Sequence, residues 1–221
     1  WTIIPVIVLA ALIIYGLFTW SDIMYVDEDE DPLVIELYAY QFDWRARYSG
    51  KDNALGKANV RLIEGINQLG VDTSDPNAQD DKVVNELHLP LGRKVLFKMR
   101  SQDVLHSAYM PHFRAQMNCV PGMITQFAFT PSMTTDDMRM NDEVIEKVEY
   151  INQIRTEKNI ELLAKGEEVL EMYEFDYLLL CNKICGSNHF NMQMKIIVDT
   201  EEKYNTWLAE QATIAETIKN K

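Results

Sequence analysis

The first twenty residues constrain the fold most strongly, because the chain holds no charged side chain before Asp22. They read WTIIPVIVLAALIIYGLFTW. An apolar helix of about 20 residues, rising ~1.5 Å per residue, spans the ~30 Å hydrocarbon core of a bilayer. Trp1, Trp20 and Tyr25 lie near the ends of this stretch, where aromatic residues are frequent in membrane helices. Residues 1–25 are therefore predicted to form a transmembrane helix.

Two other interpretations of this stretch are weaker. A helix in the core of a soluble protein would show a polar face at some helical phase, and none is present. A signal peptide would need a basic start and a small-residue cleavage site, and both are missing. Because the chain starts without Met, we expect a processed product or a part of a longer one.

The middle of the chain is predicted to be an all-β domain. After the acidic segment 27–32, residues 33–50 are aromatic and β-branched with partial alternation, which predicts one strand. Residues 51–82 are polar and without a sustained period, which predicts loops. Further strands are predicted at 85–89, 94–100, 122–130, 174–180 and 193–199. Short strands separated by Pro and Gly turns favour a sandwich or a Greek-key barrel.

Two helical segments accompany the strands. Residues 135–171 are charged and have apolar side chains at helical spacing, so they are predicted to be an insertion that lies on the domain or contacts a partner subunit. Residues 201–221 are predicted to form a C-terminal amphipathic helix. The expected organisation is a membrane helix at 1–25, a β domain at 26–200 with its helical insertion, and this last helix.

The net charge narrows the range of partners. The chain has 34 acidic and 21 basic residues, for a formal net charge of -13. Such a surface repels nucleic acid and anionic lipid headgroups and attracts basic proteins. No nucleic acid partner is expected.

The strongest chemical signal is the segment CNKICGSNHFNM, which presents Cys181, Cys185, His189 and Met192. These soft donors suit copper or zinc rather than calcium or magnesium, and a thioether favours copper. A single blue-copper site uses one thiolate. Two thiolates therefore suggest a pair of copper ions bridged by both sulfur atoms, and a second histidine is needed.

His106 is the natural second histidine, because it lies in DVLHSAYMPH, in a loop predicted after a strand and before a proline. His88 and His112 compete for this role, although each is more simply a packing or surface residue. A Cys181–Cys185 disulfide would leave His189 and Met192 without a role, and a structural zinc site is the other alternative.

The third cysteine, Cys119, stands alone in an apolar stretch and is predicted to be a small buried hydrophobe.

At these residues the chain resembles subunit II of the haem-copper cytochrome c oxidases. The loop of that family has the form C-x-E-x-C-x-x-x-H-x-x-M, and this sequence matches it except at the glutamate. The resemblance extends to DVLHS, to VPG at 120–122, to the aromatic strand segment QFDW at 41–44 and to the opening WTIIP. It covers residues 1–50, 84–130 and 174–210.

The resemblance implies a cupredoxin-type barrel that follows a transmembrane hairpin, with the first helix of the hairpin missing from this chain. One copper would take His106 and Met192, and the other would take His189 and the backbone carbonyl of Lys183. The two cysteine sulfurs would bridge them in a dinuclear CuA centre.

The implied role is to relay electrons from a cytochrome c to haem in oxidase subunit I, with no catalytic residue in this chain. The expected partners are subunit I, the other oxidase subunits, cytochrome c and membrane lipid. The expected location is a bacterial cytoplasmic membrane with the copper domain on the extracytoplasmic side.

Two departures from the family pattern concern a second metal. Lys183 replaces the usual glutamate, and Asn118 replaces an expected aspartate. The family's glutamate helps to bind magnesium at the subunit interface, and a lysine cannot do so. We therefore expect this magnesium site to be altered or absent.

A third departure concerns the aromatic residues at which electrons enter the domain. Phe42 stands where the family has its first strand tryptophan, while Trp44 remains. Tyr40 and Tyr109 are aromatic candidates to replace the missing indole. The insertion before Cys181 is longer than usual, which favours a bacterial oxidase.

Three other functions remain for comparison. The copper domain of a nitrous oxide reductase would lack the membrane helix, and a quinol-oxidase relative would lack the copper ligands. A membrane-anchored copper chaperone would bind one copper ion rather than two, so the copper count separates it from a relay.

Overall fold

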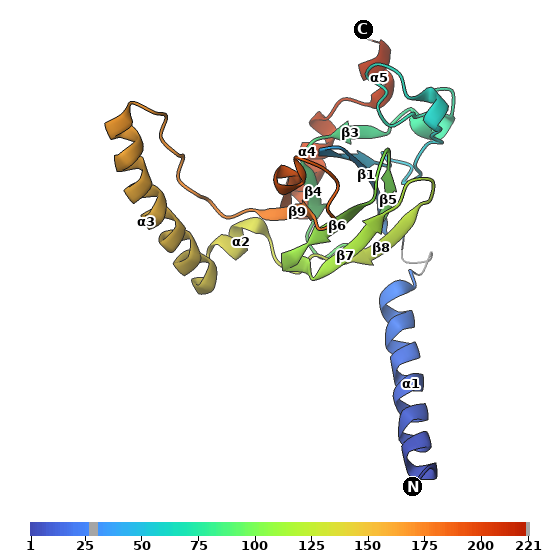
Figure 1. Cartoon of the computed structure of the whole chain (residues 1–221). Helices are drawn as coiled ribbons and strands as arrows, with labels where there is room; N and C mark the ends of the chain where they lie inside the picture. Colours follow the sequence, from blue (N-terminus) through green and yellow to red (C-terminus); the bar gives the residue numbers. More distant parts are fainter. Residues whose placement is uncertain (27–30, 220–221) are drawn as a thin grey trace.

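The computed structural model describes residues 1–26 and 31–219. The acidic residues 27–30, which make up most of the predicted linker, and residues 220–221 lie outside the described residues. Two five-stranded sheets form the body of the described chain, with strand orders β3-β2-β1-β5-β8 and β4-β10-β9-β6-β7. They make up the barrel in Figure 1, from which one helix extends to the N-terminus.

The elements have the following bounds. The strands are β1 (Leu33–Tyr40), β2 (Asp43–Tyr48), β3 (Lys82–Val84), β4 (Leu87–Pro90), β5 (Val95–Ser101), β6 (His106–Met110), β7 (Ala115–Cys119), β8 (Thr125–Phe129), β9 (Tyr177–Cys181) and β10 (Gln193–Asp199). The helices are α1 (Ile3–Met24), α2 (Thr135–Arg139), α3 (Asp142–Lys165), α4 (Glu201–Glu210) and α5 (Ile214–Lys219). Short 3-10 turns include η2 (Val60–Leu62) and η5 (His189–Asn191).

The core fills the space between the two sheets. Strand β5 alternates buried and partly buried residues, as expected when one face of a strand packs inward. Fully buried side chains from both sheets meet there, among them Trp44, Phe97 and Leu179. The predicted all-β, cupredoxin-type fold with an N-terminal apolar helix and C-terminal helices is confirmed.

The prediction of one strand over 33–50 is wrong, because the chain reverses direction at Gln41 and Phe42. Strands β1 and β2 form an antiparallel hairpin in which Tyr40 faces Asp43. The segments on both sides of the turn have the same aromatic and β-branched character, and its two central residues are not Gly, Pro, Asn, Asp or Ser. Asp43, which closes the turn, is therefore the one local sign of the reversal.

His106 was predicted to lie in a loop, whereas the structure places it at the start of β6. This strand is short and contains small and polar residues, so its own pattern predicts little. It is stabilised instead by its two antiparallel neighbours, β7 and β9.

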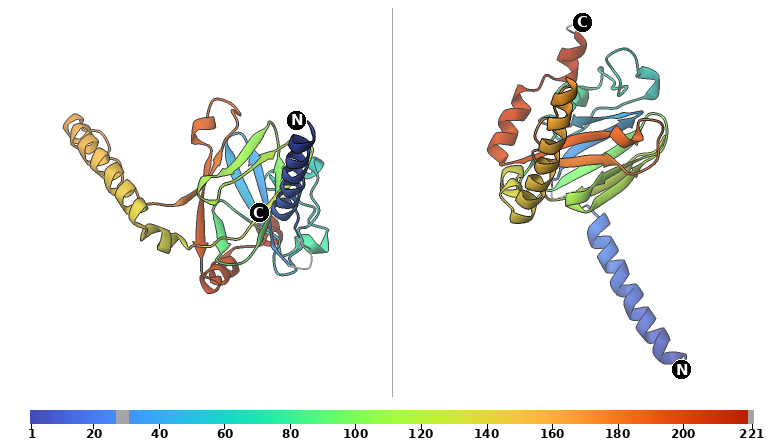
Figure 2. Two further views of the ribbon diagram at one scale, coloured as in Figure 1. Left: turned by 90° about the horizontal axis from the view of Figure 1, so that it is seen from below. Right: turned by 60° about the vertical axis from the view of Figure 1, so that its left-hand side comes forward.

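Helix α1 has 22 residues and a mean hydropathy of 2.4, and none of it is buried. By length and composition it can cross a membrane. In the segment predicted as a helical insertion, 135–171, the structure has α2 and α3. The left view of Figure 2 shows α3 standing clear of the barrel.

The predicted single helix at the C-terminus is instead two helices, α4 and α5. Thr213 begins the second one, because its hydroxyl accepts the N–H of Glu216 at 3.2 Å while the Glu216 carboxylate accepts the N–H of Thr213 at 2.9 Å. This reciprocal pair is a capping box, and it starts a new helix. The N–H of Ile214 also donates to the carbonyl of Asp81, which fixes the new direction.

A buried ion network ties the long 51–82 segment to the barrel. Arg47, which is 2% exposed, contacts Glu36 through its Nε at 2.6 Å and Asp81 through its Nη1 at 3.2 Å. Asp81 also accepts the N–H of Gly56 at 3.0 Å. Burial of its carboxyl raises the pKa of Asp81 to about 6.

Candidate metal centre

The predicted ligand loop lies between β9 and β10, which pair antiparallel. Cys181 is the last residue of β9, and Met192 directly precedes β10. The N–H of Cys181 donates to the carbonyl of Met192 at 3.1 Å and closes the base of the loop. The sheet thus brings the first and last candidate ligands together although 11 positions separate them in the sequence.

The two cysteine side chains face each other inside the loop. Their sulfur atoms are 3.8 Å apart, and both residues are buried free thiols. A disulfide holds its sulfurs about 2.05 Å apart. The alternative of a Cys181–Cys185 disulfide is therefore not formed in this structure. Burial, and next the neighbouring Cys181, raise the pKa of Cys185 to about 11. Because metals bind the thiolate, a metal would have to displace protons here.

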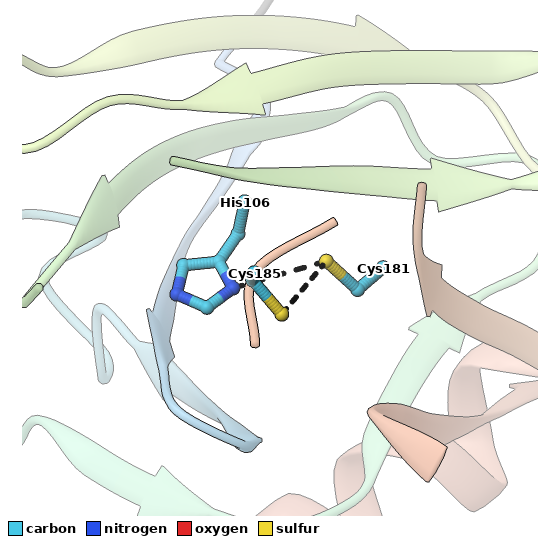
Figure 3. Close-up of side chains that lie close together, drawn as sticks. All are labelled: His106, Cys181 and Cys185. Atoms are coloured by element: carbon cyan, nitrogen blue, oxygen red, sulfur yellow. Dashed lines mark hydrogen bonds between the residues drawn. The ribbon is translucent and has the colours of Figure 1, made fainter. Parts of the chain in front are cut away.

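The other candidate donors surround this pair of sulfurs. His106 is fully buried, and its Nδ1 lies 3.8 Å from the sulfur of Cys181. Figure 3 shows these two residues and Cys185 pointing toward one another. Their donor atoms all lie within 4.8 Å of one another.

On the opposite side of the loop, the sulfur of Cys185 lies 3.7 Å from Nδ1 of His189 and 3.8 Å from Sδ of Met192. The backbone carbonyl oxygen of Lys183 is 3.3 Å from the sulfur of Cys181. The structure therefore brings all six predicted positions into one cluster.

The spacing and chemistry of this cluster fit soft metal ions. Donor atoms bound to one ion at about 2.0–2.3 Å lie roughly 3.5–4 Å apart. The nitrogen–sulfur and sulfur–sulfur distances above fall in this range. Two thiols, two imidazoles and a thioether form a donor set suited to copper.

The ring of His106 is held in place by Asp103, a residue that the sequence analysis did not single out. Its carboxylate oxygen Oδ1 lies 2.8 Å from Nε2 of His106. The other oxygen, Oδ2, accepts the backbone N–H of Gln41 at 2.7 Å. A carboxylate at this ring nitrogen orients the second nitrogen toward a metal. The position of Asp103, three residues before a candidate ligand, was the available sequence signal.

The β1–β2 turn supports the loop from outside. The side chain of Gln41 donates to the carbonyl of Cys185. The ring of Phe42 packs against Gly186, where an added Cβ would lie 2.7 Å from ring carbons. Gly186 also has φ +145, a backbone conformation that other residues rarely adopt.

Two of the four aromatic candidates for receiving electrons lie beside the cluster. Trp44 is fully buried, and its ring meets that of His106 edge-on at 6.3 Å between centroids. Phe42 is half-buried against the loop. The hydroxyl of Tyr40 instead donates to Asp43 at 3.1 Å. Tyr109 is half-buried on β6.

The remaining histidines lie away from the cluster, whereas the third cysteine, Cys119, faces His106 across the β6–β7 pairing. His88 stacks on Trp207 with ring centroids 3.8 Å apart, and the ring of His112 meets that of Phe175 edge-on at 5.0 Å. Cys119 is fully buried, and burial raises the pKa of its thiol to about 12.

The side chain of Lys183 points into solvent, as does that of Asn118. The loop also exposes two large apolar side chains, Ile184 at 88% and Phe190 at 84%.

Comparison with known proteins gives a consistent result. Residues 33–138 match the family described as cytochrome C oxidase subunit II, periplasmic domain. The chain is 35% identical over 208 residues to the alternative cytochrome c oxidase subunit 2 of Bradyrhizobium diazoefficiens, covering 93% of this chain and 60% of that protein. It is 23% identical over 230 residues to cytochrome c oxidase subunit 2 of Alkalihalophilus pseudofirmus, covering 100% of this chain and 47% of that protein. The chain thus spans about half the length of these relatives.

Among solved structures, the crystal structure of the periplasmic domain of subunit II of cytochrome oxidase from Bradyrhizobium japonicum aligns with a TM-score of 0.45 and 17% identity. The alignment covers 80% of this chain and 91% of that chain.

Proposed function

Because the chain belongs with the cytochrome c oxidase subunit II proteins, the electron-accepting subunits of terminal oxidases, we propose that it receives electrons from a cytochrome c and passes them to haem in subunit I. Oxygen reduction takes place outside this chain. The single observation that carries the proposal is the cluster of two free thiols, two imidazoles and a thioether in one buried site.

The ligands would divide between two copper ions. His106 and Met192 would hold one ion, while His189 and the backbone carbonyl of Lys183 would hold the other. The thiolates of Cys181 and Cys185 would be shared by both. When bound, the copper pair supplies reversible one-electron chemistry.

The chain's own residues hold this site rigid and dry. His106 is fully buried and fixed by Asp103, and Cys181 and Met192 are fixed by the β9–β10 pairing. Little rearrangement accompanies a change of charge when the donors are held in this way, which favours fast electron transfer. Trp44, packed on His106, and Phe42, at the loop surface, are the proposed aromatic contacts of the electron path.

The membrane arrangement completes the proposal. Helix α1 spans the cytoplasmic membrane of a bacterium, and the β domain lies on the extracytoplasmic side with subunit I and the other oxidase subunits beside it. The exposed ammonium group of Lys183 does not hold an interface magnesium ion.

Copper counting tests the proposal. The full chain in detergent, loaded with copper, should bind two ions and show one unpaired electron coupled equally to both nuclei. Cys185→Ser should abolish this signal, while the matched variant Cys119→Ala should keep it. A spectrum of a single copper ion in the wild type would overturn the relay and favour a copper chaperone.

Docking of the donor is tested separately. The net charge of -13 should attract a basic cytochrome c, so the rate of electron transfer should fall steeply with added salt. A flat salt response would instead indicate either a donor attached to the oxidase or a donor that docks through apolar side chains such as Ile184 and Phe190, which are exposed.

A further inference from the structure

Helix α3 and the segment that follows it form an arm, residues 142–176, that leaves the barrel. The arm contacts the core at its two ends, through Val144 and Val148 in the first turns of α3 and through Phe175 just before β9. Beyond Val148, no residue of α3 belongs to a core cluster of the described chain. Figure 1 and the left view of Figure 2 both show the rest of the helix separated from the two sheets.

The arm nevertheless has a defined structure of its own. Its return segment, residues 167–176, runs back along α3 and is held by two asparagines of the helix. The amide of Asn152 donates to the carbonyl of Tyr173 at 3.0 Å and accepts its N–H at 2.6 Å. The amide of Asn159 does the same with Leu170, at 2.8 and 2.7 Å. An asparagine amide offers a donor and an acceptor together, so each pair fixes the register of the return segment.

The far end of the arm exposes a group of large apolar side chains, named here the apolar tip. It comprises Ile160 at 66%, Leu163 at 66%, Val169 at 49% and Leu170 at 38% exposure. The first two lie three positions apart on one helical face, and the bonds from Asn159 bring the return segment beside them. Exposure of these apolar side chains to water is unfavourable. Exposed apolar groups of this kind mark a surface that another molecule covers.

The net charge of the arm indicates which kind of surface covers the apolar tip. The part of the arm that bears the tip, residues 157–171, contains 5 acidic and 2 basic residues, so its net charge is -3. The arm of a second copy would carry the same charge and be repelled, as would anionic lipid headgroups. A basic protein surface around an apolar centre complements the arm, because charged rims and apolar cores combine in protein interfaces.

We propose that the arm is a docking site for a basic protein partner, which covers the apolar tip. The acidic side chains around the tip attract and orient the partner, and the apolar tip supplies the buried contact. This inference does not depend on the copper centre.

Photo-crosslinking in the native membrane tests this proposal. The full chain with benzoylphenylalanine in place of Ile160 should give an adduct with one protein of basic surface. That protein, once purified, should bind the wild-type chain, and salt should weaken the binding. The double variant Ile160→Ser/Leu163→Ser should bind it at least about tenfold more weakly. The control Val60→Ser, at a residue 72% exposed in the turn η2, should bind normally.

Other outcomes would overturn the proposal. They are an adduct with a second copy of the chain, with lipid or with an acidic protein, the absence of any adduct, or unchanged binding by the double variant. Circular dichroism of the double variant should match the wild type, because both replaced side chains are 66% exposed.

Discussion

Replacing Asp81 with asparagine should change how the stability of the protein depends on pH. The side chain of Asp81 is fully buried, and burial is the main reason that its pKa is raised to about 6 from an ordinary value of 3.8. Arg47 and the N–H of Gly56 oppose this increase, while the charges of Asp80 and Glu36 add to it.

The sign of this pH dependence follows from proton binding in the folded and unfolded states. Between pH 3.8 and about 6, the folded state holds the proton of Asp81 while the unfolded chain has lost it. The stabilisation from this carboxyl is therefore fully present below pH 3.8 and is lost as the pH rises through about 6. At roughly 1.4 kcal/mol for each pKa unit, the free energy involved is about 3 kcal/mol.

The asparagine side chain of the Asp81→Asn variant would not titrate. The unfolding free energy of the wild type minus that of the variant should therefore fall by about 3 kcal/mol between about pH 3.5 and about pH 8. Urea unfolding of the full chain in detergent, followed by tryptophan fluorescence, measures this difference. Asp72→Asn is a control of opposite sign, because hydrogen bonds from Ser74 lower the pKa of exposed Asp72. A difference for Asp81 that is flat, or that rises with pH, would refute the reasoning.

Three further changes test the site and the arm. Asp103→Ala releases the ring of His106 and should weaken copper binding about 10–100-fold in a competition titration; unchanged affinity would show that other contacts hold the ring. Gly186→Ala forces a Cβ against the ring of Phe42 at φ +145 and should lower the melting temperature; an unchanged melting temperature would show that the loop yields easily. Asn152→Ala removes two hydrogen bonds and should speed amide hydrogen exchange across the return segment about 10–100-fold without affecting the barrel; unchanged exchange would contradict the clamp.

Local features of the sequence predicted much of the secondary structure and most of the candidate metal-binding residues. The uncharged N-terminal stretch requires a long apolar helix, and the structure has α1 there. The strands predicted at 85–89, 94–100 and 193–199 coincide closely with β4, β5 and β10, because each has its own apolar pattern and turn residues. Four of the six proposed metal-binding positions were recognisable together because one loop presents Cys181, Cys185, His189 and Met192 within 12 residues.

Long-range contacts decided the rest. The central residues of the reversal, Gln41 and Phe42, are not typical turn residues, and β6 is short and held by β7 and β9 on its two sides. The metal cluster is the clearest case. Side-chain chemistry and spacing identified His106 and the loop ligands, but folding alone places His106 against Cys181, 75 positions away, and Asp103 behind its ring. A donor's identity is a property of one residue, whereas the distance between donors depends on how whole strands pair, and no local pattern contains that information.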